Sequence, residues 1–217
     1  LALRAKCRTC QSSISWQYPL VELGTGILFL VISKSLNLDI HSPYLILNTI
    51  YLILVTGAWY FLWLSALYDL RHKILPDFFN YAAFSLALSG FLVFEISASG
   101  FSSIIHNSSF IIHVLTTGAL FLFFFFLWYF SGGRWMGLGD AKFVLAFGFL
   151  LSPTTALVAV MLAFWVGAII GVSLIFGAKL VRSNIFKYLN LSYLDLQSEI
   201  AFGPFLFLGG ILAFSFG

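Results

Sequence analysis

Two aspartates stand beside apolar runs of the chain, one at the end of a long run and one just before a short run, and this placement makes them candidates for chemistry. Asp69 lies in LYDLRHKILPD, residues 67–77, and Asp140 lies in MGLGDAK, residues 136–142. Two carboxyl groups at close range do not both ionise readily, so one holds a proton at neutral pH while the other stays charged. The charged partner can take a proton from an attacking water, and the protonated partner can donate to the oxyanion and the leaving amine. Such a pair is suited to peptide hydrolysis.

Two glycines and a lysine flank the second aspartate. Gly137 and Gly139 would let the backbone turn tightly and approach a substrate segment without interference from a Cβ atom. The same letters also suit a structural turn, in which Asp140 accepts backbone N–H bonds at a helix start. Lys142 would lower the pKa of an aspartate or bind substrate, although retention of positive charge at the inner membrane surface explains it equally well.

The elements that must position these residues are membrane helices. Apolar residues make up 61% of the 217 positions and charged residues only 9%, so lipid is the solvent for most of the chain. Four apolar runs, at 43–67, 78–96, 110–130 and 154–178, are long enough to cross a bilayer. Shorter runs at 20–36, 141–151 and 201–217 bring the predicted total to about seven. We therefore expect an all-α integral membrane protein, a polytopic bundle of about seven transmembrane helices.

The positions of lysine and arginine predict how these helices are oriented. With seven spans and a cytoplasmic start, ten basic residues fall on the cytoplasmic side and only Lys34 falls outside. Residues 1–19, 68–77 and 131–140 then lie together in the cytoplasm, which places the candidate active site at the cytoplasmic membrane interface. The net charge of +3 is small and is not gathered along one face, so nucleic-acid binding is not expected.

The two cysteines form a separate candidate site. Cys7 and Cys10 stand in a CxxC, which supplies two of the four thiolates of a tetracysteine zinc site, and the sequence contains no second pair. A free thiol pair and a disulfide are the alternatives, and the predicted cytoplasmic location disfavours a stable disulfide.

Four segments of the chain together resemble one family. The CxxCxxxIxxxYPLVE that ends at Glu22, the DxxxxxLPD at 69–77, the GxGD at 137–140 and the FGPFL at 202–206 occur in the order seen in type IV prepilin peptidases. GxGD alone would be weak, because many glycine-rich turns carry it, but the resemblance covers nearly the whole chain. It implies that Asp69 and Asp140 are the catalytic pair and that Glu22 and Lys142 belong to the active-site environment. A capping or interfacial role at the start of the first span explains Glu22 equally well.

The resemblance also implies an activity, a location and substrates. It implies a multi-pass aspartic endopeptidase of the bacterial inner membrane that cleaves the leader from prepilin-like precursors, pilins and pseudopilins, on the cytoplasmic side. N-methylation of the new terminus, with S-adenosylmethionine as donor, often accompanies cleavage in this family, whereas the peptidase step needs no cofactor. In bifunctional members, a similar upstream CxxC would complete a zinc site with Cys7 and Cys10.

The sequence also predicts a division of the chain near residue 19 and leaves two alternative functions open. We expect an N-terminally incomplete chain, in which residues 1–19 end a zinc or methylation subdomain and residues 20–217 form the transmembrane peptidase domain. A preflagellin-type or other GxGD protease is one alternative, although those smaller relatives are expected to lack the CxxC. A transporter or secretion-assembly subunit, whose aspartates pair with basic residues or relay protons, is the other. Gly203 and Pro204 are expected to kink or end a helix.

Overall fold

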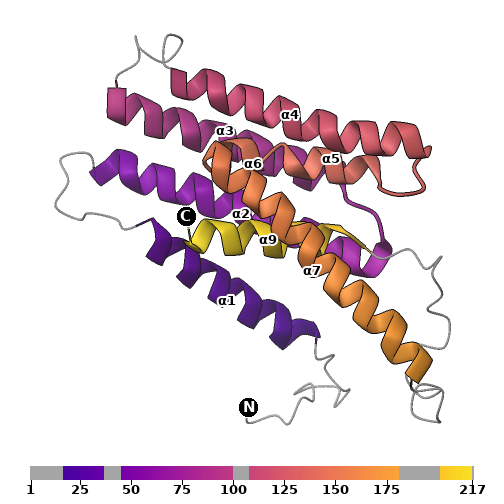
Figure 1. Cartoon of the computed structure of the whole chain (residues 1–217). Coiled ribbons are helices and arrows are strands. Elements are labelled where there is room, and N and C mark those ends of the chain that lie inside the picture. Colours follow the sequence, from indigo (N-terminus) through magenta and orange to yellow (C-terminus); the bar gives the residue numbers. More distant parts are fainter. Residues whose placement is uncertain (1–16, 37–44, 100–107, 181–200, 217) are drawn as a thin grey trace, which may run out of the picture. The chain divides into compact units, whose positions relative to one another are not determined.

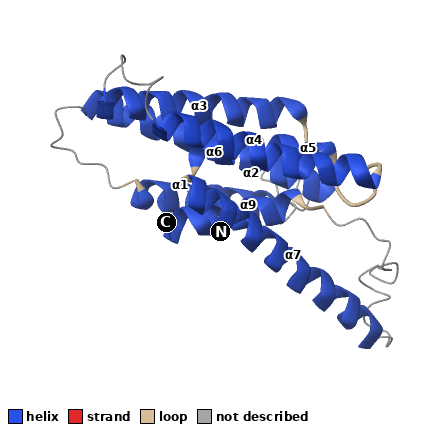
Figure 2. Ribbon diagram, turned by 45° about the horizontal axis from the view of Figure 1, so that its top comes forward, coloured by secondary structure: helices blue, strands red, loops and turns tan. Residues whose placement is uncertain are grey.

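The computed structural model describes residues 17–36, 45–99, 108–180 and 201–216, and their regular structure is entirely helical (Figures 1 and 2). The chain divides into two compact units, Leu1–Leu38 and Asp39–Gly217. The first unit contains α1 (Gln17–Ser35). The second contains α2 (Leu45–His72), α3 (Asp77–Ser99), α4 (Ser108–Ser131), α5 (Leu138–Val144), α6 (Phe147–Leu150), α7 (Pro153–Leu180) and α9 (Gly203–Phe216). The predicted all-α class is confirmed for the described ranges, and the predicted boundary after residue 19 stays a prediction.

Four described helices are long and apolar enough to cross a membrane. They are α2, α3, α4 and α7, over Ile46–His72, Asp77–Ser97, Ser108–Ser131 and Pro153–Ser173. Large apolar side chains such as Leu115 and Phe130 of α4 and Trp165 of α7 are exposed on their surfaces. Side chains of this kind over whole helix faces are favourable against lipid rather than water. The chain is therefore a polytopic membrane protein, and the four long spans predicted from the sequence are confirmed.

The three shorter apolar runs differ from one another, and among the described residues only the four long helices have the length and composition of a span. The run at 20–36 forms most of α1, a single helix of 19 residues. The run at 141–151 is not one helix, because α5 ends at Val144 and α6 covers only Phe147–Leu150. Helices of seven and four residues are far too short to cross about 30 Å at 1.5 Å per residue. Their apolar side chains are instead buried against α3 and α4. The last run forms α9, which has 14 residues.

Tight helix packing builds the second unit. In it, α2 packs along α3, α7 packs along α9, and α9 also contacts α2. Gly209 of α9 faces Ala159 and Ala163 of α7, so small residues on both helices allow a close approach. The fully buried Trp59 of α2 contacts the rings of Phe147 in α6 and Phe207 in α9. This aromatic core ties three elements of distant sequence together.

The candidate active site

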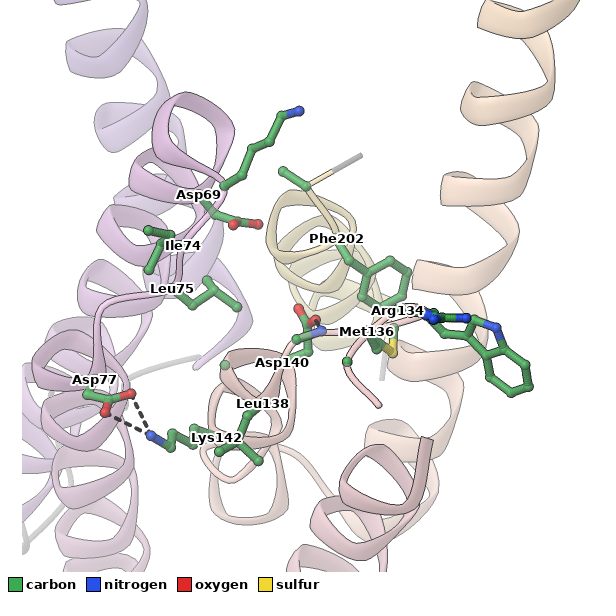
Figure 3. Close-up of a pocket in the computed structure, with 16 residues that line it drawn as sticks. Asp69, Ile74, Leu75, Asp77, Arg134, Met136, Leu138, Asp140, Lys142 and Phe202 are labelled. Atoms are coloured by element: carbon green, nitrogen blue, oxygen red, sulfur yellow. Dashed lines mark hydrogen bonds and ion pairs between the residues drawn. The ribbon is translucent and has the colours of Figure 1, made fainter. Parts of the chain in front are cut away.

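A cavity of about 710 Å³ lies where several helix ends of the second unit meet. Its lining residues come from the end of α2, the start of α3, the segment between α4 and α5, α5 itself, and the residues just before α9. Figure 3 shows Asp69 and Asp140 on this lining, on separate elements, with their carboxyl groups in the space between those elements. The two aspartates singled out from the sequence are thus brought together in one cavity.

Asp69 lies in the last turn of α2, and its side chain is 5% exposed. Its Oδ2 accepts a hydrogen bond of 3.0 Å from the backbone N–H of Gly203, the first residue of α9. Helix α2 ends directly after this turn, because Lys73 adopts φ 54° while its N–H bonds the Asp69 carbonyl at 2.8 Å. Positive φ is rare for a residue with a side chain, and it turns the chain sharply toward the cavity.

Asp140 lies in the first turn of α5, and it is as buried as Asp69, at 5% exposure. Its Oδ2 accepts a hydrogen bond of 3.2 Å from the N–H of Gly137, which is the N-cap residue of α5. One of the two carboxyl oxygens of Asp140 therefore has the structural role that the sequence also allowed, which is to cap the start of a helix. The other oxygen, Oδ1, is buried and has no hydrogen-bond partner among the described residues.

The second glycine of the GxGD segment is required by a neighbour rather than by its own backbone angles. A Cβ atom on Gly139 would lie 2.7 Å from Cβ of Leu75, a distance that real Cβ atoms essentially never show. Gly137 differs, because the nearest atom to its Cβ position is Oδ2 of Asp140 at 3.7 Å, an ordinary contact. Leu75, from the segment between α2 and α3, therefore packs directly against the backbone that carries Asp140.

Lys142 lies on the cavity wall but is engaged by another acid. Its ammonium group donates to both carboxylate oxygens of Asp77, at 2.7 and 2.8 Å (Figure 3). It also lies 5.6 Å from the ring centre of Tyr81. The hydrogen bond to Asp77 raises the pKa of Lys142, so the amine stays charged. This ion pair joins the first turn of α3 to α5, and so it holds the helix that carries Asp140.

The electrostatics of the cavity separate the two aspartates from ordinary surface acids. Burial, and after it the negative charge of Asp69, together raise the pKa of Asp140 to about 7, against an opposing effect of the Gly137 hydrogen bond. Asp140 therefore keeps its proton to a higher pH than an ordinary aspartate does. A protonated carboxyl group beside an ionised one is the charge state that acid–base hydrolysis by two carboxyl groups needs.

Three other predicted site residues belong to the first compact unit, so their relation to this cavity stays a prediction. Glu22 lies in α1, in the first compact unit, and its side chain is exposed. Cys7 and Cys10 lie outside the described residues. Among the residues that the structure describes, no group of three or more His, Cys, Asp and Glu side chains could hold a metal ion.

Comparison with known proteins identifies the family to which this architecture belongs. The model of the type IV leader peptidase family matches residues 56–172, more than half of the chain, and the matched range includes both aspartates. The chain belongs to the type IV leader peptidase family. The model of the bacterial peptidase A24 N-terminal domain matches residues 1–36, which contain the CxxC segment. The family resemblance seen in the four sequence motifs is thereby confirmed.

Three relatives of this chain carry the same name. The chain is 31% identical over 220 residues to the prepilin leader peptidase/N-methyltransferase of Aeromonas hydrophila. It is 30% identical over 220 residues to that of Aeromonas salmonicida and 29% identical over 221 residues to that of Legionella pneumophila. These alignments cover 100% of the chain but 64 to 65% of the relatives, so the chain spans slightly less than two thirds of their length. No solved structure matches the chain.

Two residues at the cavity were not assigned a site role from the sequence. Leu75 fixes the approach of the GxGD backbone, and Gly203 donates the hydrogen bond to Asp69. Leu75 lies in LPD and Gly203 in FGPFL, and both segments carried the family resemblance. Their membership of these motifs was the sequence feature that could have pointed to a site role. Helix α9 begins at Gly203, with Pro204 in its first turn, where a missing N–H costs nothing. The expected kink or helix end at these two residues is therefore wrong.

Proposed function

We propose that this chain is a membrane aspartic endopeptidase that cleaves the leader peptide of type IV prepilin-like precursors. The observation that carries the proposal is the pair of buried aspartates, Asp69 and Asp140, which α2 and α5 place in one cavity. Membership of the leader peptidase family and the names of the relatives support the same reaction. We assign the two aspartates as the catalytic pair.

The location of the cavity suits a substrate that sits partly in the membrane. The cavity lies at helix ends, and its wall carries the basic residues Lys73, Arg134 and Lys142. Basic residues gather at the cytoplasmic ends of membrane helices, so we place the cavity at the cytoplasmic face of the bacterial inner membrane. A precursor with a short polar leader and a hydrophobic helix would present its cleavage site at this depth.

The relatives' names include a second activity. An N-methyltransferase needs a methyl donor, and we propose that the protein uses S-adenosylmethionine to methylate the new terminus. A zinc site that includes Cys7 and Cys10 stays a prediction. The cavity itself supplies the two carboxyl groups that peptide cleavage needs, those of Asp69 and Asp140.

Single substitutions of the two aspartates test the peptidase function. Asp69→Asn and Asp140→Asn keep the side-chain shape but remove the acid, so each is expected to abolish cleavage of a co-produced prepilin-like precursor. Asp39→Asn, outside every motif, serves as the matched control and is expected to cleave normally. Gel mobility of the precursor and mass spectrometry of its new N-terminus measure cleavage, and membrane fractionation confirms insertion of each variant. Near-normal cleavage by either cavity variant would refute the assignment and return the transporter alternative to consideration.

A further inference from the structure

The two aspartates share one cavity but have unlike hydrogen-bond surroundings. Both are 5% exposed, so burial alone does not distinguish them. The difference lies in what faces each carboxyl oxygen, and it indicates which of the two holds the proton.

Asp69 receives a hydrogen bond from a distant helix. The N–H of Gly203 reaches its Oδ2 at 3.0 Å across a separation of 134 residues. This N–H is one of the first donors of a 14-residue helix, donors that have no partner inside the helix and carry partial positive charge. A buried N–H at the positive end of a helix stabilises a carboxylate more than a neutral acid.

Gly203 is built into this position by close packing. A Cβ atom on residue 203 would lie 2.8 Å from Oδ2 of Asp69 and 2.9 Å from Cδ2 of Leu75. Only a residue without a side chain lets the backbone come close enough to donate this hydrogen bond. The start of α9 is therefore fitted to the carboxyl group of Asp69.

Asp140 has weaker support for a negative charge. Its Oδ2 accepts only the local bond from Gly137, at 3.2 Å, and its buried Oδ1 has no partner among the described residues. Lys142, the nearest cation in sequence, donates instead to Asp77. A buried carboxylate oxygen without a donor is costly, whereas a protonated oxygen at the same place can donate its own hydrogen bond.

The charged groups around the cavity are consistent with this difference. Its titratable lining side chains are Asp69, Lys73, Asp77, Arg134, Asp140 and Lys142, and α9 contributes none. Asp77 and Lys142 neutralise each other, and among the described residues neither Lys73 nor Arg134 on the cavity wall forms an ion pair with either aspartate. Burial and the charge of Asp69 raise the pKa of Asp140 to about 7, in agreement with the hydrogen-bond pattern.

We propose that Asp69 is the ionised carboxylate that activates water, that Asp140 is the protonated acid, and that Gly203 is a positioning residue for Asp69. This division of roles rests on the proposed peptidase function. In the first step, Asp69 takes a proton from water as the water oxygen bonds to the scissile carbonyl carbon, and Asp140 gives its proton to the carbonyl oxygen. In the second step, the C–N bond breaks, Asp69 returns its proton to the amine, and Asp140 recovers a proton from the intermediate's hydroxyl.

Infrared difference spectroscopy of the purified full chain tests the protonation states without any substrate. At pH 6, the spectrum of the wild type minus Asp140→Asn is expected to show the C=O band of a protonated carboxylic acid. The spectrum of the wild type minus Asp69→Asn is expected to show carboxylate bands instead. Asp77→Asn is the matched control and is expected to remove only carboxylate bands, because Asp77 is ion-paired and 59% exposed on its side chain. The reverse assignment, or the same type of band from both cavity aspartates, would overturn the proposal.

A second experiment tests the positioning role of Gly203. Gly203→Ala places a Cβ against Asp69 and weakens the hydrogen bond, so cleavage is expected to fall about tenfold to a hundredfold. The acidic limb of the pH–rate profile should move to higher pH, because the ionised form of Asp69 is less stabilised. Gly118→Ala is the control, since a Cβ there meets nothing within 4 Å. A rate loss in Gly203→Ala with an unmoved acidic limb would show a merely structural role and contradict the proposal.

The infrared spectra and the cleavage rates of the two aspartate variants together separate failure of this inference from failure of the peptidase function. If Asp69→Asn and Asp140→Asn abolish cleavage but the infrared spectra assign the proton to Asp69, only the division of roles is wrong. If both variants cleave normally, the peptidase function itself is wrong, whatever the spectra show.

Discussion

The contact between Gly139 and Leu75 provides a sharp test of how the GxGD segment is held. Gly139→Ala would place its new Cβ 2.7 Å from Cβ of Leu75, about 1 Å inside an ordinary carbon–carbon contact. Because a Cβ atom cannot rotate away, the backbone that carries Asp140 must shift. Overpacking of this kind typically costs about 1–3 kcal/mol. A displacement of about 1 Å at reacting groups can cost about a hundredfold in rate, so we expect a loss of that order in precursor cleavage.

The two glycines of the GxGD segment can be compared with each other, because a Cβ atom clashes at only one of them. Gly137→Ala meets its nearest neighbour at 3.7 Å, and Gly118→Ala in α4 meets nothing within 4 Å. Gly137→Ala is expected to lose much less activity than Gly139→Ala, and Gly118→Ala is expected to match the wild type. The assay is the initial rate of precursor cleavage in detergent, well below the unfolding temperature of every variant. Equal losses at positions 137 and 139, or a Gly139→Ala rate within about threefold of the wild type, would refute the role of Leu75.

Three further predictions concern pH, an ion pair and a strained residue. Because the pKa of Asp140 is about 7 when folded and about 4 when unfolded, its contribution to stability should be lost as pH rises from about 4 to about 7. Thermal unfolding of the wild type against Asp140→Asn measures this slope, and parallel curves would contradict it. Lys142→Ala should lower the free energy of unfolding by less than about 1 kcal/mol, since Asp77 is largely exposed. Lys142→Arg should restore this free energy, and a larger loss for Lys142→Ala in denaturant titration would contradict the prediction. Lys73→Gly should be about 1 kcal/mol more stable than Lys73→Ala in the same titration, because only glycine adopts φ 54° without strain, and equal stabilities would count against it.

The long helices and the two aspartates could be predicted from sequence because their signals are local. An apolar run of about 20 residues has one favourable form in lipid, and the four such runs became α2, α3, α4 and α7. Asp69 and Asp140 were found because an acid next to an apolar run, at membrane depth, is costly and needs a reason. The shared motif order then narrowed the chemistry to a peptidase.

The contacts that shape the cavity could not be predicted because they join residues far apart in the chain. The Lys142 and Asp77 pair spans 65 residues, and the bond from Gly203 to Asp69 spans 134. The run at 141–151 was predicted as a span because burial among helices and contact with lipid select the same apolar residues. Its break between α5 and α6 depends on packing against α3 and α4, which the sequence does not encode locally.

A double-mutant cycle on Asp69 and Asp140 tests the central claim most directly. If the two carboxyl groups act on one water, each single change to Asn should reduce the cleavage rate to the background, at least about a thousandfold. The double variant should then be no slower than either single variant, because removal of one partner already disables the pair. Losses that multiply in the double variant, or a single variant that retains substantial cleavage, would contradict a shared catalytic pair.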